Sequence, residues 1–266
     1  MAASVKHGHS STFARWMAAR FGAGLAADAV KRYRLGASKH WDGANVFWQV
    51  DTSGRIRGGK VMQYDETGHR VKVPTNRVTW VHSVLRLEGY NLSQCFFGEH
   101  LLPDRPSDRV AIVESEKTAI VASLYLPSMV WIATGGKNGC KWKTEATVTN
   151  VLRGRKVVLF PDLGAFADWQ HLADRLREAG AQVTVNALLE KNATPNERAN
   201  GLDLADYLLR FEPHQFTSPS VEVKEATQPI PTAPDNSRIT GATNPSAPID
   251  WSRLDEPEPW EKDPFQ

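Results

Sequence analysis

The second half of the chain alternates short apolar segments with helical patterns, and this alternation constrains the fold more than any other feature. The apolar segments are RVAIVE, MVWIA, KVVLF and QVTVNAL, and helical patterns follow three of them: EKTAIVASL, AFADWQHLADRLREAG and LDLADYLLRF. Continuous apolar strands that alternate with helices indicate a parallel sheet covered on both faces. Functional side chains in such sheets gather at the carboxyl ends of the strands.

The first half has a different pattern. Residues 11–33 favour a helix with Ser11 or Thr12 as N-cap, split in two by Gly22 and Gly24. The segments NVFWQVD, RIRGGKVMQYD and HRVKV, separated by the turn signals TSG and ETG, predict a three-stranded antiparallel meander. The sequence therefore predicts an α/β protein in which a small α+β lobe precedes the parallel-sheet domain.

Charge is distributed unevenly along the chain. Between Lys31 and Arg77 there are ten basic residues against four acidic ones, whereas from Glu212 to Gln266 there are four basic against ten acidic. Such asymmetry is typical of nucleic-acid binding proteins with an acidic tail. Strand alternation places two arginines of the meander on one face, which either contacts nucleic acid or is simply solvated. The residues expected to bind nucleic acid are Arg34, Lys39, Arg55, Arg57 and Lys60.

Aromatic residues lie among these basic positions. Trp41, Phe47, Trp48 and Tyr64 could stack on bases where they are exposed, although aromatic residues in such strands usually belong to the core.

The composition changes after Phe211. Ten of the sixteen prolines lie beyond this residue, mixed with polar and acidic residues, and this predicts a disordered tail over residues 213–266. The tail ends in an acidic stretch that contains Trp251, Trp260 and Phe265. It could dock onto a replication partner such as a helicase, or it could serve only as a solubilising tail.

No apolar run is long enough for a transmembrane helix, and the N-terminus lacks the apolar stretch of a secretory signal. The two cysteines, Cys95 and Cys140, predict free thiols in a reducing cytoplasm rather than a disulfide framework. We therefore expect a cytoplasmic protein without a membrane partner.

Carboxylates mark the predicted strand ends. Glu114 and Asp162 each follow an apolar strand, and Asp203 and Asp206 lie three residues apart at the start of the last helix. Paired carboxylates bind Mg²⁺ through oxygen, and Mg²⁺ commonly takes phosphates as further ligands. The alternative is that Asp162 and Asp203 only cap helices.

The stretches VAIVESEKTAIVAS, WIATGG, VVLFPDLGAFADW and GLDLADYLL occur in this order. Together they resemble the toprim domain of bacterial primases and topoisomerases, and are most similar to toprim-containing primase-like proteins of bacterial plasmids and mobile elements. The preceding segments YRLGASKHWDGANVFWQVDTSGRIRGGKVMQYD and CFFGEHLL resemble the region before toprim in those proteins. The similarity spans residues 13–211.

The resemblance implies roles for individual residues. Glu114 matches the glutamate that acts as general acid or base in nucleotidyl transfer. Asp162 and Asp203, with Asp206 as a further candidate, match positions that hold Mg²⁺ or Mn²⁺. Gly135 and Gly136 match the turn after the second strand, and we group Lys137 with them as a candidate phosphate contact. Lys117, in the first turn after Glu114, either neutralises a phosphate or is a solvated helix residue.

Two positions depart from the family pattern. The family carries Asp-x-Asp after the third strand, but Gly164 stands at the second position here, and Thr118 replaces a later aspartate of the first motif.

The resulting prediction is a basic primase-like lobe over residues 1–104, a toprim domain over residues 105–212 and a disordered tail over residues 213–266. The predicted function is primase-like: a magnesium-dependent nucleotidyltransferase that acts on single-stranded DNA and nucleotides in the replication of a mobile element. The alternatives are a toprim nuclease and a non-catalytic protein that binds single-stranded nucleic acid.

Overall fold

The computed structural model describes residues 1–137 and 139–217. Both sheets belong to one compact unit, Met1–Arg210, and a separate unit begins at Phe211 with the short helix α11 (His214–Thr217). From residue 218 onward, the predicted disordered tail and its aromatic residues lie outside the described residues. None of the helices in the described part of the chain is long and apolar enough to cross a membrane.

Short helices open the chain: α1 (Ala2–Lys6), the 3-10 turn η1 (Gly8–Ser10), α2 (Thr12–Phe21) and α3 (Ala23–Arg32). The predicted cap is confirmed, because the Ser11 hydroxyl accepts the Ala14 N–H at 3.2 Å. The predicted split is also present, but it falls at Gly22 alone, whose φ of 88° ends α2, while Gly24 lies inside α3.

The first sheet is antiparallel and has four strands in the order β1-β2-β3-β4: β1 (Gly36–Ser38), β2 (Ala44–Val50), β3 (Ile56–Met62) and β4 (Val78–Trp80). The prediction of residues 69–73 as the third strand was wrong. That segment is no regular strand: it pairs with residues 63–65 through an isolated bridge between Tyr64 and Arg70 and two flanking backbone hydrogen bonds, and β4 pairs with β3 instead. Pro74 follows directly and has no N–H for a ladder, which explains why the strand pattern does not continue into a paired strand.

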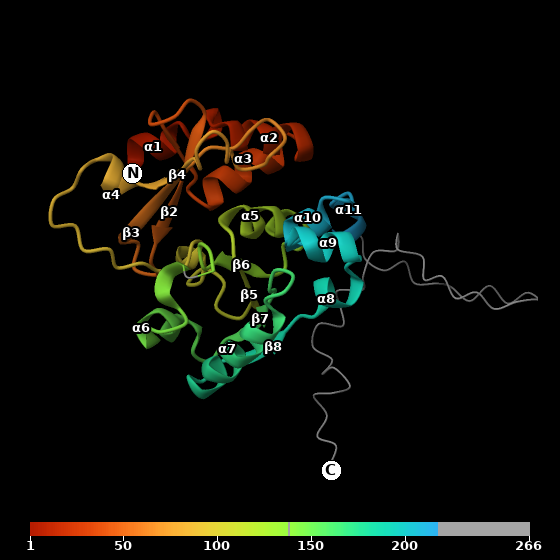
Figure 1. Cartoon of the computed structure of the whole chain (residues 1–266). Helices are drawn as coiled ribbons and strands as arrows, with labels where there is room; N and C mark the ends of the chain where they lie inside the picture. The colour runs from red at the N-terminus through yellow and green to blue at the C-terminus, as the bar shows by residue number, and fades with distance from the viewer. Residues whose placement is uncertain (138, 218–266) are drawn as a thin grey trace, which may run out of the picture. The chain divides into compact units, whose positions relative to one another are not determined.

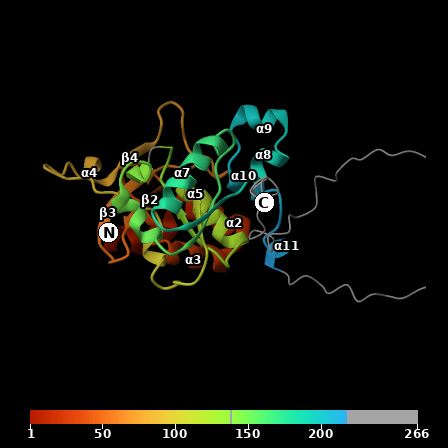
Figure 2. The same cartoon turned by 90° about the horizontal axis from the view of Figure 1, so that it is seen from below.

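The second sheet confirms the predicted parallel α/β arrangement. Its strands run in the order β6-β5-β7-β8, all parallel: β5 (Val110–Val113), β6 (Val130–Ala133), β7 (Lys156–Leu159) and β8 (Gln182–Val185). Helices α5 (Glu116–Tyr125) and α7 (Phe166–Glu178) lie on opposite faces of this sheet, with α5 on the side of the antiparallel sheet (Figure 1). Figure 2 shows the same elements from below.

The remaining elements are short. They are α4 (Val81–Val84), η2 (Glu99–Leu101), η3 (Gly139–Lys141), α6 (Ala146–Thr149), η4 (Asn150–Leu152), α8 (Leu188–Asn192), α9 (Pro195–Asn200) and α10 (Leu204–Leu208).

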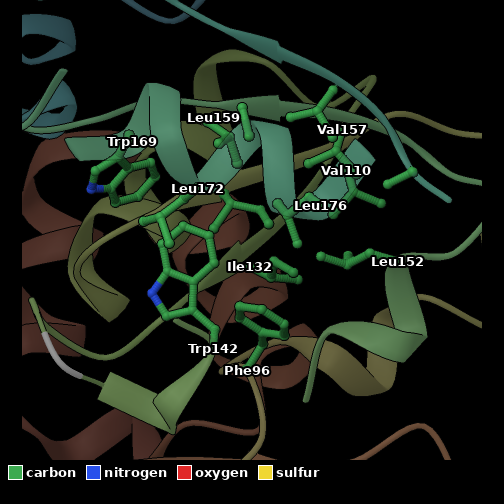
Figure 3. Packing of buried hydrophobic residues seen from close by; sticks show 14 of the residues in the cluster. Phe96, Val110, Ile132, Trp142, Leu152, Val157, Leu159, Trp169, Leu172 and Leu176 are labelled. Atoms are coloured by element: carbon green, nitrogen blue, oxygen red, sulfur yellow. The ribbon is translucent and has the colours of Figure 1, made fainter. Parts of the chain in front are cut away.

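Helix α7 closes one face of the parallel sheet through an apolar stripe. Trp169, Leu172 and Leu176 recur at helical spacing and are buried. The Trp142 ring packs against Trp169 with ring centroids 5.1 Å apart, and Figure 3 shows both in the same cluster as the sheet residue Ile132. The stripe fixes α7 on the sheet and so sets where the loop after β7 can run.

Helix α5 is buried along its whole length. A helix that is buried on all sides lies between two layers, and α5 contacts strands β5 and β6 as well as helices α3 and α10. Two opposite charges in its first turn are nevertheless buried, Glu116 and Lys117. The Glu116 carboxylate forms a buried ion pair with Lys60 of β3 at 2.6 Å, and this pair joins the antiparallel sheet to α5.

We expect Lys60→Met to destabilise the fold strongly. The substitution leaves the Glu116 charge buried without its partner, at a cost of about 3–5 kcal/mol. The double variant Lys60→Met/Glu116→Gln removes both charges and should recover most of the loss. Urea unfolding followed by circular dichroism measures both effects, with Lys72→Met, at an exposed lysine of the same lobe, as control. Equal stability of Lys60→Met and the control would contradict a structural role for the ion pair.

Glu99 is a second buried charge between the lobes. Its side chain is 3% exposed and accepts the N–H groups of Thr52 and Phe96 at 3.3 and 3.2 Å. Burial raises the pKa of Glu99 to about 7, and the nearby Asp51 acts in the same direction. Because the folded state then binds more protons than the unfolded state between about pH 4.5 and 7, stability falls as pH rises through this window.

Replacement of Glu99 by Gln should reduce this pH dependence. We expect the stability difference between Glu99→Gln and the unmodified chain to shift in favour of the variant by on the order of 2 kcal/mol from pH 5 to pH 8. At pH 5 the variant should be less stable, because an amide oxygen cannot replace both carboxylate acceptors. Urea midpoints at the two pH values measure the shift. The control Glu178→Gln, at an exposed residue, should show no such shift. If the stability of Glu99→Gln changes with pH as that of the unmodified chain does, Glu99 is not the source of the pH dependence.

Candidate active site

Two carboxylates meet at the carboxyl end of the parallel sheet. Glu114 follows β5 directly, and Asp162 lies in the loop that leaves β7, the neighbouring strand. The Glu114 side chain acts on Asp162, since it is among the groups that raise the pKa of the Asp162 carboxyl. The structure thus brings together the two strand-end residues that the sequence singled out.

Asp203 and Asp206 join this pair from the start of α10. Asp203 caps the helix, since its carboxylate accepts the Asp206 N–H at 2.9 Å and Asp206 returns the bond to the Asp203 N–H. The capping alternative is therefore correct for Asp203. Its other oxygen faces α5, where the Thr118 hydroxyl donates to it at 2.8 Å. Thr118, which departs from the family pattern, supplies a donor here where an aspartate would add another negative charge.

The cluster is electrostatically unfavourable by itself. Burial, together with the charges of Asp203, Glu114 and Asp206, raises the pKa of Asp162 to about 9. Burial and Asp206 also raise the pKa of Asp203, while Lys117 and the Thr118 hydroxyl act against this shift. The Oδ1 atom of Asp162 is buried and has no hydrogen-bond partner. Like charges gathered in a poorly solvated place are typical of sites that bind a cation.

Lys117 faces this cluster from the first turn of α5. Its ammonium lies 3.9 Å from the Asp206 carboxylate and 5.5 Å from the centre of the Trp16 ring. The side chain is buried, so the alternative that Lys117 is a solvated helix residue was wrong. It supplies positive charge beside the carboxylates.

The glycine turn after β6 holds the backbone of Glu114. The N–H groups of Gly135 and Gly136 both donate to the Glu114 carbonyl at 2.9 Å, and the Thr134 hydroxyl donates to the same oxygen. Both glycines have positive φ, 85° and 125°, which a residue with a side chain rarely adopts. Lys137 follows the turn and is exposed.

Sequence reasoning did not identify the contacts that support this turn from the other lobe. The Lys60 ammonium donates to the Gly135 carbonyl at 2.5 Å while it pairs with Glu116. The Gln49 amide nitrogen lies beside the same turn, buried and without a hydrogen-bond partner. The sequence contained one signal for this contact. Lys60 in β3 and Glu116 in α5 are charged residues at buried positions, and buried charges are almost always paired.

The prediction that Lys60 belongs to an exposed basic face was wrong, because its side chain is only 8% exposed. Arg55 and Arg57 do share a partner, the buried Asp51, at 2.8 and 2.7 Å. Burial by itself would raise the pKa of Asp51, but N–H groups of both arginines and of Ser53 hold it at about 2. One carboxylate between two guanidinium groups leaves a net positive charge at this end of the hairpin.

The other predicted nucleic-acid contacts lie before β2. Arg34 is partly exposed and Lys39 is exposed. Among the aromatic candidates Phe47, Trp48 and Tyr64 are core residues, as the alternative held. Trp41 is partly exposed, and the Arg77 guanidinium lies over its ring at 5.5 Å.

Gly164 occupies the position at which the toprim resemblance predicts a second aspartate. Its φ is 82°, and its N–H donates to the Glu190 carboxylate at 2.8 Å. Glu190 also pairs with Arg198 at 2.6 Å, so its charge is matched. A Cβ atom at position 164 would meet no neighbouring atom within 4 Å, but an aspartate there would have to adopt a strained backbone.

The donor chemistry of the cluster fits a divalent cation. Carboxylate oxygens are the ligands that Mg²⁺ and Mn²⁺ accept, and the unpartnered Asp162 oxygen is available. Within residues 1–137 and 139–217, no three His, Cys, Asp or Glu side chains are already arranged to hold a metal ion. A Mg²⁺ site with one or two carboxylates, completed by waters and phosphates, needs no such arrangement.

Comparisons with known proteins add the following similarities. The fold is similar to the RNA polymerase domain of Mycobacterium tuberculosis primase DnaG in complex with double-stranded DNA, at 11% identity and a TM-score of 0.49, covering 81% of this chain and 75% of that one. It is also similar to a DnaG primase catalytic domain bound to single-stranded DNA, at 15% identity and a TM-score of 0.48, covering 78% and 69%. The primase fragment of the bacteriophage T7 primase-helicase matches at 14% identity and a TM-score of 0.37, covering 73% of each chain. A search of curated proteins found no match.

One family model matches the sequence itself. Its description is a domain of unknown function (DUF6371), and it matches residues 11–163, more than half of the chain. The matched range begins at the N-cap of α2 and ends just after Asp162, so it contains Glu114 and the glycine turn. The chain therefore belongs to the DUF6371 family.

Proposed function

We propose that this chain is a primase-like nucleic-acid protein whose carboxylate cluster performs divalent-metal-dependent phosphoryl or nucleotidyl transfer. The observation that carries the proposal is the unpartnered, buried Asp162 oxygen beside Glu114 and Asp203 at the carboxyl end of the parallel sheet. The ordered motifs of the sequence support the same reading. A role in the replication of a mobile element rests on the resemblance alone.

The residues have separable tasks in this proposal. Asp162 and Asp203 would hold the cation, and Asp206 would orient Asp203 through the capping box. A bound Mg²⁺ or Mn²⁺ supplies charge neutralisation for phosphate oxygens. Glu114, fixed at its carbonyl by the glycine turn, would accept the proton of the attacking hydroxyl. Lys117 would offset charge beside Asp206, and Lys137, exposed after the turn, would contact phosphate.

A non-catalytic role is the second candidate. It is favoured by Gly164, which leaves a single carboxylate after β7, and by the capping bond that already uses one Asp203 oxygen. In that case the protein would bind single-stranded nucleic acid as an accessory. A nuclease would use the same carboxylates with water as the nucleophile.

The substitution Glu114→Gln should abolish the chemistry while it leaves the fold intact. Loss of a general base lowers turnover by about 10²–10⁴-fold. The assay compares primer synthesis on single-stranded template with cleavage of the same strand, each with Mg²⁺ or Mn²⁺. Asp168→Asn, at an exposed carboxylate at the start of α7, is the matched control. Product in the synthesis arm supports the primase reading, cleavage supports the nuclease, and no product in either arm from the unmodified chain favours the accessory protein.

The substitution Asp162→Asn should weaken the response of the protein to metal. At pH 8 the metal-free Asp162 carboxyl is largely protonated, so the amide should change the Tm of the metal-free protein little, but an amide cannot become the anionic ligand that a bound cation favours. Mg²⁺ or Mn²⁺ should raise the Tm of the unmodified chain, because a ligand that binds only the folded state stabilises it. Thermal unfolding at pH 8 with and without metal measures both effects. Identical metal responses of the two proteins would remove Asp162 from the site.

A further inference from the structure

Three aromatic rings form a column on the antiparallel lobe, outside the carboxylate cluster. Trp80 ends β4, His82 lies in α4, and Tyr90 lies in the loop that follows. The Trp80 and His82 rings are stacked with centroids 6.1 Å apart, and those of His82 and Tyr90 are stacked at 4.7 Å. The interplanar angles are 27° and 14°, so the three planes are nearly parallel.

The column is held in place by backbone contacts. The Tyr90 hydroxyl donates to the Arg57 carbonyl at 3.1 Å, and the Leu87 N–H donates to the His82 carbonyl at 3.0 Å. These bonds fix the loop against β3 and α4. The ring geometry is therefore preorganised, which lowers the entropic cost of stacking a ligand on it.

One end of the column is closed and the other is open. At the closed end the Lys60 ammonium lies 5.8 Å from the centre of the Trp80 ring. At the open end Tyr90 is 37% exposed although His82 covers one face of its ring. A further flat ring can extend the column only at Tyr90.

The closed end touches the turn that holds Glu114. Lys60 lies over Trp80 and also donates to the Gly135 carbonyl, while the Gly135 N–H donates to Glu114. Continuous contacts thus lead from the carboxylate cluster through Lys60 to the column.

The charge around the column fits a polyanion. Residues 55–90 contain seven basic residues against three acidic ones, and Arg86, between His82 and Tyr90 in sequence, is exposed. Leu85 and Leu87 are also exposed there. Basic charge combined with parallel aromatic rings is the chemistry that binds single-stranded nucleic acid, because every base offers a flat face for stacking and every phosphate a negative charge.

We infer that the Trp80–His82–Tyr90 column is a stacking platform that binds a base of single-stranded nucleic acid on the open face of Tyr90. The inference rests on the proposed function for its choice of nucleic acid, and it adds the surface that holds the strand away from the carboxylates. The aromatic residues that the sequence suggested for base stacking are not part of this column; they are Trp41, Phe47, Trp48 and Tyr64.

The test measures binding without metal, so it is independent of the chemistry. Full-length chain is titrated, in EDTA, against a labelled single-stranded oligonucleotide and against an abasic phosphodiester chain of equal length, with fluorescence anisotropy as readout. The variants are Tyr90→Ala, Tyr90→Phe, which keeps the ring, and Leu85→Ala, a control at an exposed apolar residue of the same segment. Circular dichroism confirms that each variant is folded.

We expect the unmodified chain to prefer the base-bearing strand. Tyr90→Ala should weaken that binding about tenfold and leave the abasic chain unaffected, because one stacked base contributes about 1–3 kcal/mol. Leu85→Ala should bind like the unmodified chain, and Tyr90→Phe, which keeps the ring but loses the hydroxyl bond to Arg57, should lose much less affinity than Tyr90→Ala. Undiminished binding by Tyr90→Ala, equal losses on both ligands, an equal loss in Leu85→Ala, or no binding by the unmodified chain would each overturn the inference. A base-dependent loss in Tyr90→Ala, with no product in the synthesis and cleavage assays, would instead overturn only the proposed catalysis.

Discussion

The fold depends on two opposite charges in the first turn of a helix that is buried on every side. Helix α5 fills the space between the two sheets, yet it begins with Glu116 and Lys117. An unpaired charge at such a place would cost several kcal/mol, so each needs a partner. The partners come from distant parts of the chain, Lys60 from β3 and Asp206 from α10. The antiparallel lobe and the last helix of the unit are thereby attached to the same turn, two residues after Glu114.

The same region contains a cluster of carboxylates that are unfavourable to one another. Asp162, Asp203 and Glu114 interact unfavourably as like charges, and the single positive charge of Lys117 offsets only part of this repulsion. A sequence selected for stability alone would replace one of these carboxylates by an amide or an apolar residue. Residues that break the local rules of polar satisfaction tend to lie at functional sites. The cluster is easier to explain as a place where a cation and phosphate oxygens complete the charge balance than as a support for the fold, although Asp203 serves both purposes through its cap.

The sequence predicted what depends on local pattern. The four parallel strands, their helices and the Ser11 cap follow from periodicity and residue type, and strand ends in one parallel sheet explain why Glu114 and Asp162 meet. The prediction failed where contacts between distant parts of the chain determine which segments pair and which side chains are buried. Strand β4 is a three-residue segment without a distinct pattern, and it pairs with β3 across a loop that looked more strand-like. Lys60 looked like a surface base because alternation does not reveal that another layer covers the strand. The ring column was missed for a related reason, since its members lie in a strand, a helix and a loop.

Electrostatics explains why the proposed function assigns strand binding and the carboxylate cluster to different lobes. A single strand of nucleic acid carries a negative charge on every phosphate, and a cluster of carboxylates repels it until a cation is bound. The binding energy for the strand must therefore come from another surface. The antiparallel lobe offers an excess of basic residues and an exposed aromatic ring, and its Lys60 side chain contacts the Glu114 turn. Lys60 contacts the Trp80 ring, Glu116 and Gly135 at once. Under the proposed function, binding and chemistry are therefore assigned to different sheets, and Lys60, whose ion pair stabilises the fold, contacts both the ring column and the Glu114 turn.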